Sequence, residues 1–171
     1  MKDFQAKRVT KRYTHEIKGA PSEVFPLLCP TREYDWIDGW TCRMVYSESG
    51  YAENNCIFTT SFARQAEEMF VVSRYDPEHY VIEFVVISPE THVTKFDISL
   101  DDCGDQTTRI NWAHTLTGLT EKGNALVEDY TEKNYTAIMS RLSEALDHYC
   151  KTGKMLKRHS ILGLLHAIGH K

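Results

Sequence analysis

The last third of the chain shows the pattern of one long amphipathic helix. Between residues 121 and 152, apolar side chains recur at spacings of three and four residues, and no proline interrupts the stretch. Thr120 is a typical N-cap, and Gly153 stands where a left-handed residue would end the last turn. At about 1.5 Å per residue such a helix is roughly 48 Å long. A helix of this length needs a large partner to bury its apolar face.

Most of the chain before this helix shows the alternation expected of strands. In a first strand predicted over residues 4–18, Tyr13, His15 and Ile17 share one face. Turn residues such as Asp76-Pro77 and Pro89-Glu90 divide the later chain. Six further strands are therefore predicted, at residues 40–47, 55–63, 69–75, 79–88, 92–101 and 106–117. Their short connections favour antiparallel neighbours.

Two short helices are predicted between the first two strands. Pro21 suits a first helical turn, Pro30 ends the helix over residues 21–28, and Thr31 is a candidate N-cap for a second helix reaching Trp36. The order of elements predicts an α+β domain, in which a curved sheet of seven antiparallel strands wraps around the C-terminal helix. We predict one domain over residues 1–153 and a basic amphipathic tail over residues 154–171.

Charge and hydropathy argue against nucleic-acid binding and against a membrane-spanning protein. The net charge of −4 combines +4 in the tail with −8 in residues 1–153, which hold 16 basic and 24 acidic residues. An acidic domain is a poor partner for nucleic acid. The longest apolar run is too short to span a bilayer, and the N-terminal stretch lacks the apolar core of a signal peptide. We therefore predict a cytoplasmic protein with no integral membrane segment.

Two stretches resemble a known superfamily. Residues 15–25 (HEIKGAPSEVF), followed by Trp36, and residues 108–123 (TRINWAHTLTGLTEKG) are similar to the START-like or SRPBCC superfamily. It includes the Bet v 1 allergens, polyketide cyclases and activator domains of co-chaperones. The resemblance covers about residues 4–152 and is greatest with bacterial or archaeal members of uncharacterised function. It implies a helix-grip fold with a cavity between sheet and helix, which in relatives holds lipids, sterols, polyketides or other apolar molecules.

The alternation of inward and outward side chains along each strand predicts which residues would line such a cavity. Aromatic linings with a few polar groups are the usual form of a small-molecule site. The leading hypothesis is binding of a small hydrophobic or amphipathic ligand, lipid-like or polyketide-like; simple core packing is the alternative for most of the lining. The candidate ligand-binding residues are Tyr13, His15, Trp36, Trp40, Met44, Phe58, Phe84, Phe96, Trp112, His114, Tyr130, Asn134 and Ile138.

His15 and His114 are the candidates for catalysis. Both are predicted to point inward, on the first and last strands, which the resemblance places side by side. An imidazole in an apolar pocket can act as a general base near neutral pH. A cyclase or dehydratase therefore stays open beside the binding protein, as does the interpretation of both as hydrogen-bonded core histidines. A third alternative is a co-chaperone-like interaction module.

Metal and cofactor motifs are weak. The five cysteines form no C-x-x-C pair, and Rieske-type cysteine and histidine pairs are missing, so we expect no cofactor. His166 and His170, four residues apart in the tail, offer at most two ligands to a metal. Glu67-Glu68 falls in a predicted turn, where a solvated charge is the ordinary interpretation. The apolar residues of the tail also allow contact with its own domain or with a second copy, which leaves a homodimer open.

Overall fold

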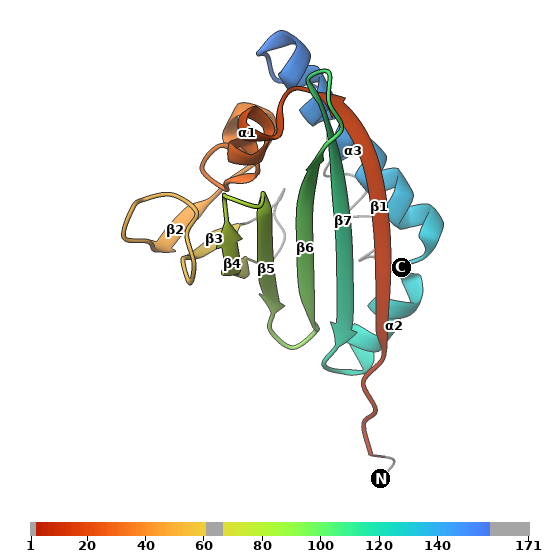
Figure 1. Cartoon of the computed structure of the whole chain (residues 1–171). Helices are drawn as coiled ribbons and strands as arrows, with labels where there is room; N and C mark the ends of the chain where they lie inside the picture. The colour runs from red at the N-terminus through yellow and green to blue at the C-terminus, as the bar shows by residue number, and fades with distance from the viewer. Residues whose placement is uncertain (1–2, 61–66, 158–171) are drawn as a thin grey trace.

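The computed structural model describes residues 3–60 and 67–157. A seven-stranded antiparallel sheet curves around the C-terminal helices, in the order β1-β7-β6-β5-β4-β3-β2 (Figure 1). This arrangement confirms the predicted helix-grip fold. The tail residues His166 and His170 lie outside the described part of the chain. The strands are β1 (Arg8–Lys18), β2 (Arg43–Tyr46), β3 (Ile57–Thr60), β4 (Glu68–Asp76), β5 (Val81–Ser88), β6 (His92–Asp102) and β7 (Thr107–Gly118).

The edge strand β2 is shorter than its predicted range of residues 40–47. Trp40 and Cys42 precede it, and a bulge between Met44 and Tyr46 disturbs its pairing with β3. The indole of Trp40 donates a hydrogen bond to the Pro30 carbonyl at 2.8 Å. This bond holds the segment before β2 against the short helices instead of in the sheet.

A corner of short helices follows β1. It comprises α1 (Pro21–Val24) and the 3-10 helices η1 (Phe25–Leu28) and η2 (Glu33–Asp35). Trp36 is fully buried there and donates from its indole to the Leu27 carbonyl at 2.8 Å. The prediction that Thr31 caps the second helix is wrong: Arg32 is the N-cap of η2, and the Thr31 hydroxyl lies 3.2 Å from Cys29 Sγ instead.

The C-terminal helix is divided in two, contrary to the prediction of one continuous helix. Helix α2 spans Glu121–Asp129 and α3 spans Glu132–Thr152. The Thr131 hydroxyl accepts a hydrogen bond from the Asn134 amide at 3.3 Å and so starts α3 as an N-cap. Threonine competes with the helical backbone for hydrogen bonds, so a new helix begins here without a proline. The predicted caps Thr120 and Gly153 are confirmed.

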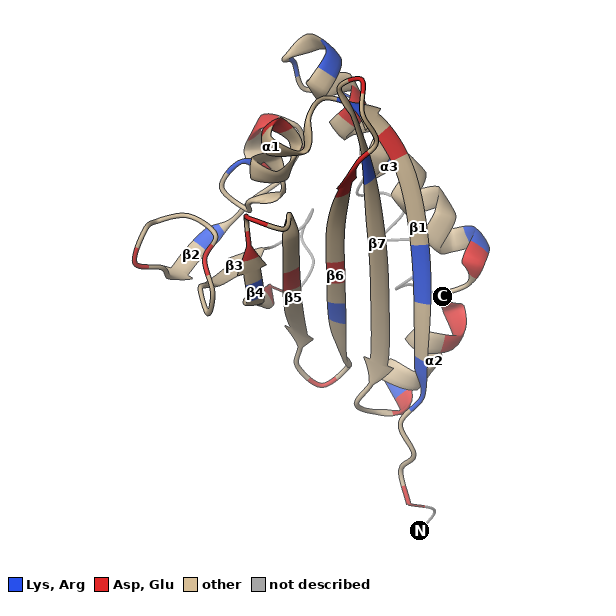
Figure 2. Cartoon of the chain, viewed as in Figure 1, with Lys and Arg blue, Asp and Glu red and all other residues tan. Residues whose placement is uncertain are grey.

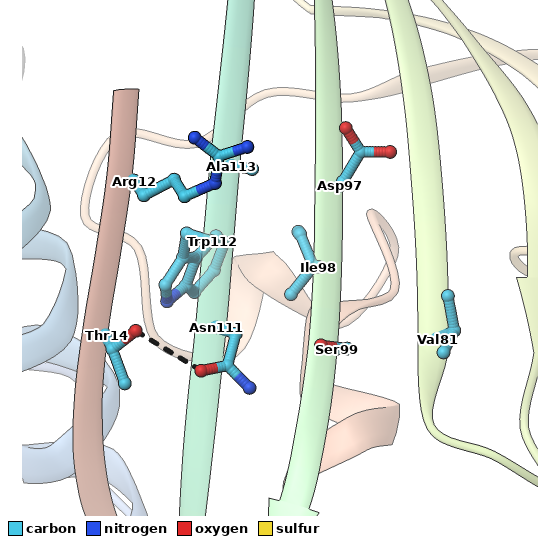
Figure 3. Close-up of a pocket in the computed structure, with 9 residues that line it drawn as sticks. All are labelled: Arg12, Thr14, Val81, Asp97, Ile98, Ser99, Asn111, Trp112 and Ala113. Atoms are coloured by element: carbon cyan, nitrogen blue, oxygen red, sulfur yellow. Dashed lines mark hydrogen bonds between the residues drawn. The ribbon is translucent and has the colours of Figure 1, made fainter. Parts of the chain in front are cut away.

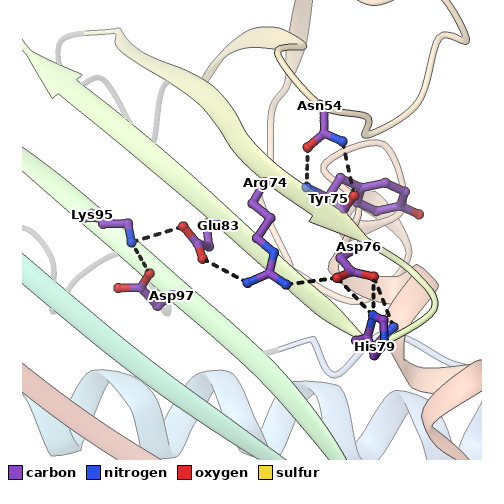
Figure 4. A network of polar contacts seen from close by, with 8 residues as sticks. All are labelled: Asn54, Arg74, Tyr75, Asp76, His79, Glu83, Lys95 and Asp97. Carbon is purple, nitrogen blue, oxygen red and sulfur yellow. Dashed lines mark hydrogen bonds and ion pairs between the residues drawn. The ribbon is translucent and has the colours of Figure 1, made fainter.

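The sheet encloses an apolar interior against α3 and turns a charged face outward. On α3 the fully buried side chains are Tyr135, Met139, Ala145 and Leu146. Charged residues of both signs lie along β1 and β6, and β5 carries an acidic residue (Figure 2). An ion-pair network there joins strands β4, β5 and β6 through Arg74, Glu83, Lys95 and Asp97 (Figure 4). The predicted outward orientation of Glu83 and Asp97 is confirmed.

No helix in the described ranges has both the length and the apolar character needed to cross a bilayer.

Candidate functional site

A row of aromatic rings crosses the interior face of the sheet. Neighbouring ring centroids in this row are 4.2–6.5 Å apart, so each ring contacts the next. The row runs from β1 across the sheet to β3, so the interior face is aromatic from one edge of the sheet to the strand next to the other edge. Its members, in order, are Tyr13, His15, Trp112, His114, Phe96, Phe70 and Phe58.

His15 and His114 lie on the same face but do not form a pair. In the register of β1 with β7, His15 is opposite Ile110 and His114 is opposite Lys11. Four residues of β7, roughly 13 Å at about 3.3 Å per residue, separate the two pairing positions. Trp112 lies between them, with its ring 6.4 Å from that of His15 and 6.5 Å from that of His114. The expected approach of the two imidazoles is therefore wrong.

His114 is joined to the helical layer instead. Its Nδ1 lies 3.1 Å from Tyr130 Oη, and its ring meets Tyr135 edge-on at 5.1 Å. Burial lowers the pKa of His114 to about 3, and burial raises the pKa of the Tyr130 phenol. Both groups are thus neutral at physiological pH, and a neutral hydrogen bond connects β7 to the residue where α2 ends.

Four buried polar atoms in and beside the aromatic row have no hydrogen-bond partner within the described residues. They are Nδ1 and Nε2 of His15, Nε1 of Trp112 and Oη of Tyr135. Burial lowers the pKa of His15 to about 4, opposed by the charge of Asp147 on α3. A buried polar group without a partner costs about 1–3 kcal/mol. The interior therefore holds hydrogen-bonding capacity that the described residues leave unused.

The predicted lining residues divide into two groups. The structure brings together on the interior face Tyr13, His15, Phe58, Phe84, Phe96, Trp112 and His114, with Tyr130 beside them. The others have different places. Trp36 and Trp40 belong to the helical corner, Asn134 donates to the Asp129 carbonyl at the helix break, and Ile138 is half-buried on α3. Met44, half-buried on edge strand β2, is paired with Phe58 and packs against the same core, so it belongs with the first group.

Sequence reasoning missed Tyr135 and Lys11. Tyr135 is nine residues after Leu126, which at about 100° per residue is half a turn away from it on one continuous helix. The break at Thr131 removes that constraint and allows Tyr135 to face the sheet. Lys11 shares the inward parity of Tyr13 and forms an ion pair with Glu132 at 3.1 Å. Strict alternation along β1 would have identified it.

A shallow groove on the outer face of the sheet is a weaker candidate site. It lies over the small side chain of Ala113, between Arg12 and Asp97 (Figure 3). Its central amide is already hydrogen-bonded, because Asn111 accepts from Thr14 at 3.2 Å and donates to Asp101 at 2.9 Å. The groove is thus open to solvent and its central amide is satisfied, whereas the unpartnered groups of the interior are buried.

No family model and no curated protein matches this sequence. Solved structures do match the fold. Norcoclaurine synthase from Thalictrum flavum, in complex with dopamine and hydroxybenzaldehyde, is 13% identical with a TM-score of 0.65, covering 87% of this chain and 90% of its own. Ara h 8.0201 is 11% identical with a TM-score of 0.64, covering 85% and 99%. Major latex-like protein 151 from Panax ginseng is 13% identical with a TM-score of 0.62, covering 83% and 97%. At these identities the similarity establishes the fold alone.

Proposed function

On the premise that this chain has the Bet v 1-type helix-grip fold, we propose that it binds a small amphipathic molecule between the sheet and α3. The apolar body of the ligand contacts the aromatic row, and its polar end bonds to Trp112, Tyr135 and His15. Affinity comes mainly from buried apolar area, at roughly 25 cal/mol per Å², reduced by the entropy lost on association.

The observation that carries the proposal is the unused hydrogen-bonding capacity of the interior. The three tryptophans provide an internal comparison. The indoles of Trp36 and Trp40 each donate to a backbone carbonyl, whereas that of Trp112, also buried, has no acceptor within the described residues. An indole N–H can only donate. An oxygen or nitrogen acceptor on the ligand would give the Trp112 N–H its missing partner. The Tyr135 hydroxyl on α3 offers a second donor from the opposite side.

The fold neighbours support a small ligand of aromatic character. The norcoclaurine synthase structure contains dopamine and hydroxybenzaldehyde, two small aromatic molecules. In the present chain, the aromatic row provides rings for stacking and edge-on contact with a ligand of this kind. We therefore favour an aromatic or polyketide-like ligand.

The enzyme alternative has less support. A cyclase or dehydratase of the predicted kind needs two histidines acting on one substrate, and Trp112 lies between them. His114 is moreover bonded to Tyr130. A binding protein does not need the two histidines to meet at one substrate, nor to exchange protons, since neutral rings suffice to orient a ligand. The cytoplasmic location and the homodimer stay predictions.

Native mass spectrometry of freshly purified protein tests the proposal. We expect a mass above that of the chain which disappears on denaturation, with the released small molecule identified in the same run. A mass equal to that of the chain before and after denaturation, together with an interior that takes up no added aromatic compound, would contradict it.

A further inference from the structure

A second polar cluster lies on the interior face, at the end of the sheet where β4 begins, β5 ends and β6 begins. It consists of Glu68, Ser88 and His92. The Ser88 hydroxyl donates to Glu68 Oε1, and His92 Nε2 lies 3.2 Å from Ser88 Oγ and 3.8 Å from Glu68 Oε1. The interpretation of Glu68 as a solvated turn residue is therefore wrong, because it is half-buried within the first pairing of β4.

The strand register places this cluster inside the sheet. Phe84, Val86 and Ser88 alternate as buried residues along β5, and His92 is directly opposite Ser88. Glu68 has the same parity as the buried Phe70 on β4. Its partner on β3 is Thr60, which is 2% exposed and whose hydroxyl has no hydrogen-bond partner in the part of the chain that the structure describes.

The hydrogen bonds around His92 determine which groups remain as acceptors. The Thr91 hydroxyl donates to the Ser88 carbonyl at 3.1 Å, so its oxygen accepts from His92 Nδ1–H, also at 3.1 Å. Burial lowers the pKa of His92, opposed by the charge of Glu68, and the neutral ring then carries its proton on Nδ1. Nε2 consequently faces the cluster as an acceptor.

The cluster is therefore short of donors and of positive charge. Its acceptors are the Glu68 carboxylate, His92 Nε2 and the Thr60 hydroxyl oxygen, while the Ser88 proton is already shared with Glu68 and the Thr60 hydroxyl is the one donor left. Among the described residues, no lysine or arginine forms an ion pair with Glu68; its one basic neighbour is His92. A cation that binds beside this partly buried carboxylate would therefore gain a charge-assisted hydrogen bond.

We propose that this cluster binds the primary ammonium group of an amphipathic amine whose apolar body lies along Phe58, Phe70 and Phe84. An ammonium group has three donors, which match the three acceptors, and its charge compensates Glu68. A ligand hydroxyl offers one donor and no charge. The ring centroids are 4.9–6.3 Å apart; Phe58 and Phe70 stack, and Phe84 meets both edge-on. Phe58 and Phe70 lie two residues from Thr60 on β3 and Glu68 on β4. The inference rests on the proposed function and adds the chemical class of the ligand.

Isothermal titration calorimetry with two ligands that share one apolar group and differ in the polar end tests the inference. Wild-type protein is titrated at pH 7 with 4-phenylbutylamine and with 4-phenylbutan-1-ol. The amine should bind at least about tenfold more tightly, the ratio expected when a partly desolvated charge gains its counterion. Binding of the alcohol reports the cavity alone, so a failure of the proposed function is distinguishable from a failure of this inference.

Three variants test which residue of the cluster binds the ammonium group. Glu68→Gln should remove the preference for the amine while leaving the affinity for the alcohol unchanged. Thr60→Val replaces the hydroxyl by a methyl of similar volume. It should weaken binding of the amine by a smaller factor than Glu68→Gln does. Glu90→Gln changes an exposed acid on the same hairpin and should retain the full preference. Equal affinity of wild type for both probes, or a preference that survives in folded Glu68→Gln, would overturn the ammonium site.

Discussion

The imidazole of His114 and the phenol of Tyr130 are connected by a 3.1 Å hydrogen bond between Nδ1 and Oη. His114 lies on β7, and Tyr130 is the C-cap of α2, whose amide donates to the Leu126 carbonyl at 3.0 Å. Thr131 begins the next helix. A single polar contact thus ties the helix break to the sheet, and the position of the break determines which face α3 turns inward.

Removing this hydrogen bond should cost stability. Tyr130→Phe keeps the ring and deletes the hydroxyl, so His114 Nδ1 loses its partner in a buried site. We expect the free energy of unfolding to fall by about 1–3 kcal/mol in urea denaturation, the range for a buried group left unsatisfied. Tyr51→Phe, a change at an exposed ring, serves as the control and should lie within about 0.5 kcal/mol of wild type. Equal stability of Tyr130→Phe and wild type would show that the bond contributes nothing.

The same substitution at Tyr135, on the other side of the helix break, should change stability in the opposite direction. The Tyr135 hydroxyl is fully buried and has no partner within the described residues, so Tyr135→Phe removes an uncompensated polar group. We expect the ligand-free protein to gain up to about 1 kcal/mol in the same denaturation experiment. Its affinity for 4-phenylbutan-1-ol should fall, because a donor to the ligand is lost. A loss of stability comparable to that of Tyr130→Phe would mean that the hydroxyl is satisfied.

Stability should also decline with acidity in a defined range. The pKa of His114 is about 3 in the folded protein, against an ordinary value of 6.5. Between these values the unfolded chain binds a proton that the folded chain does not, so the free energy of unfolding falls as pH falls. Each buried histidine of this kind contributes up to about 1.4 kcal/mol per pH unit, and burial lowers the pKa of His15 in the same direction.

Urea denaturation at several pH values between 5 and 6.5 measures this dependence. Replacing His114 by Gln removes one titrating group, so the slope of stability against pH should become smaller whatever the absolute stability of the variant. An unchanged slope in folded His114→Gln would contradict the assignment of a neutral, buried His114.

The overall fold was predictable because it depends on local patterns. Alternation located the seven strands, and short turns indicated antiparallel neighbours. The helix break was not predictable from amphipathic spacing, because the stretch contains no proline and Thr131 fits either a helix interior or an N-cap. The short edge strand β2 was misjudged for a different reason: the Trp40 bond to Pro30 is a tertiary contact that no local pattern contains.

The sequence predicted which face of the sheet each site residue occupies, but not which residues lie opposite one another on neighbouring strands. Parity placed Tyr13, His15, Trp112 and His114 inside, but only the pairing of Tyr13 with Trp112 shows that an indole separates the histidines. The cluster at Glu68 was missed because acidic residues near a turn are usually solvated. A signal was present: continuing the inward parity of β5 to Ser88 and pairing it with His92 across the hairpin would have located the cluster.

The three indole N–H resonances in a ¹H–¹⁵N spectrum test the central claim most directly. Tryptophan-to-phenylalanine variants assign them, and 4-phenylbutan-1-ol is then titrated into ¹⁵N-labelled wild-type protein. The indole N–H groups of Trp36 and Trp40 are bonded to carbonyls in the helical corner, and that of Trp112 faces the interior without an acceptor in the described chain. If the ligand lies between sheet and α3, the Trp112 resonance shifts with saturation while the other two stay in place. A spectrum in which all three resonances stay unchanged, or shift together, would contradict the account.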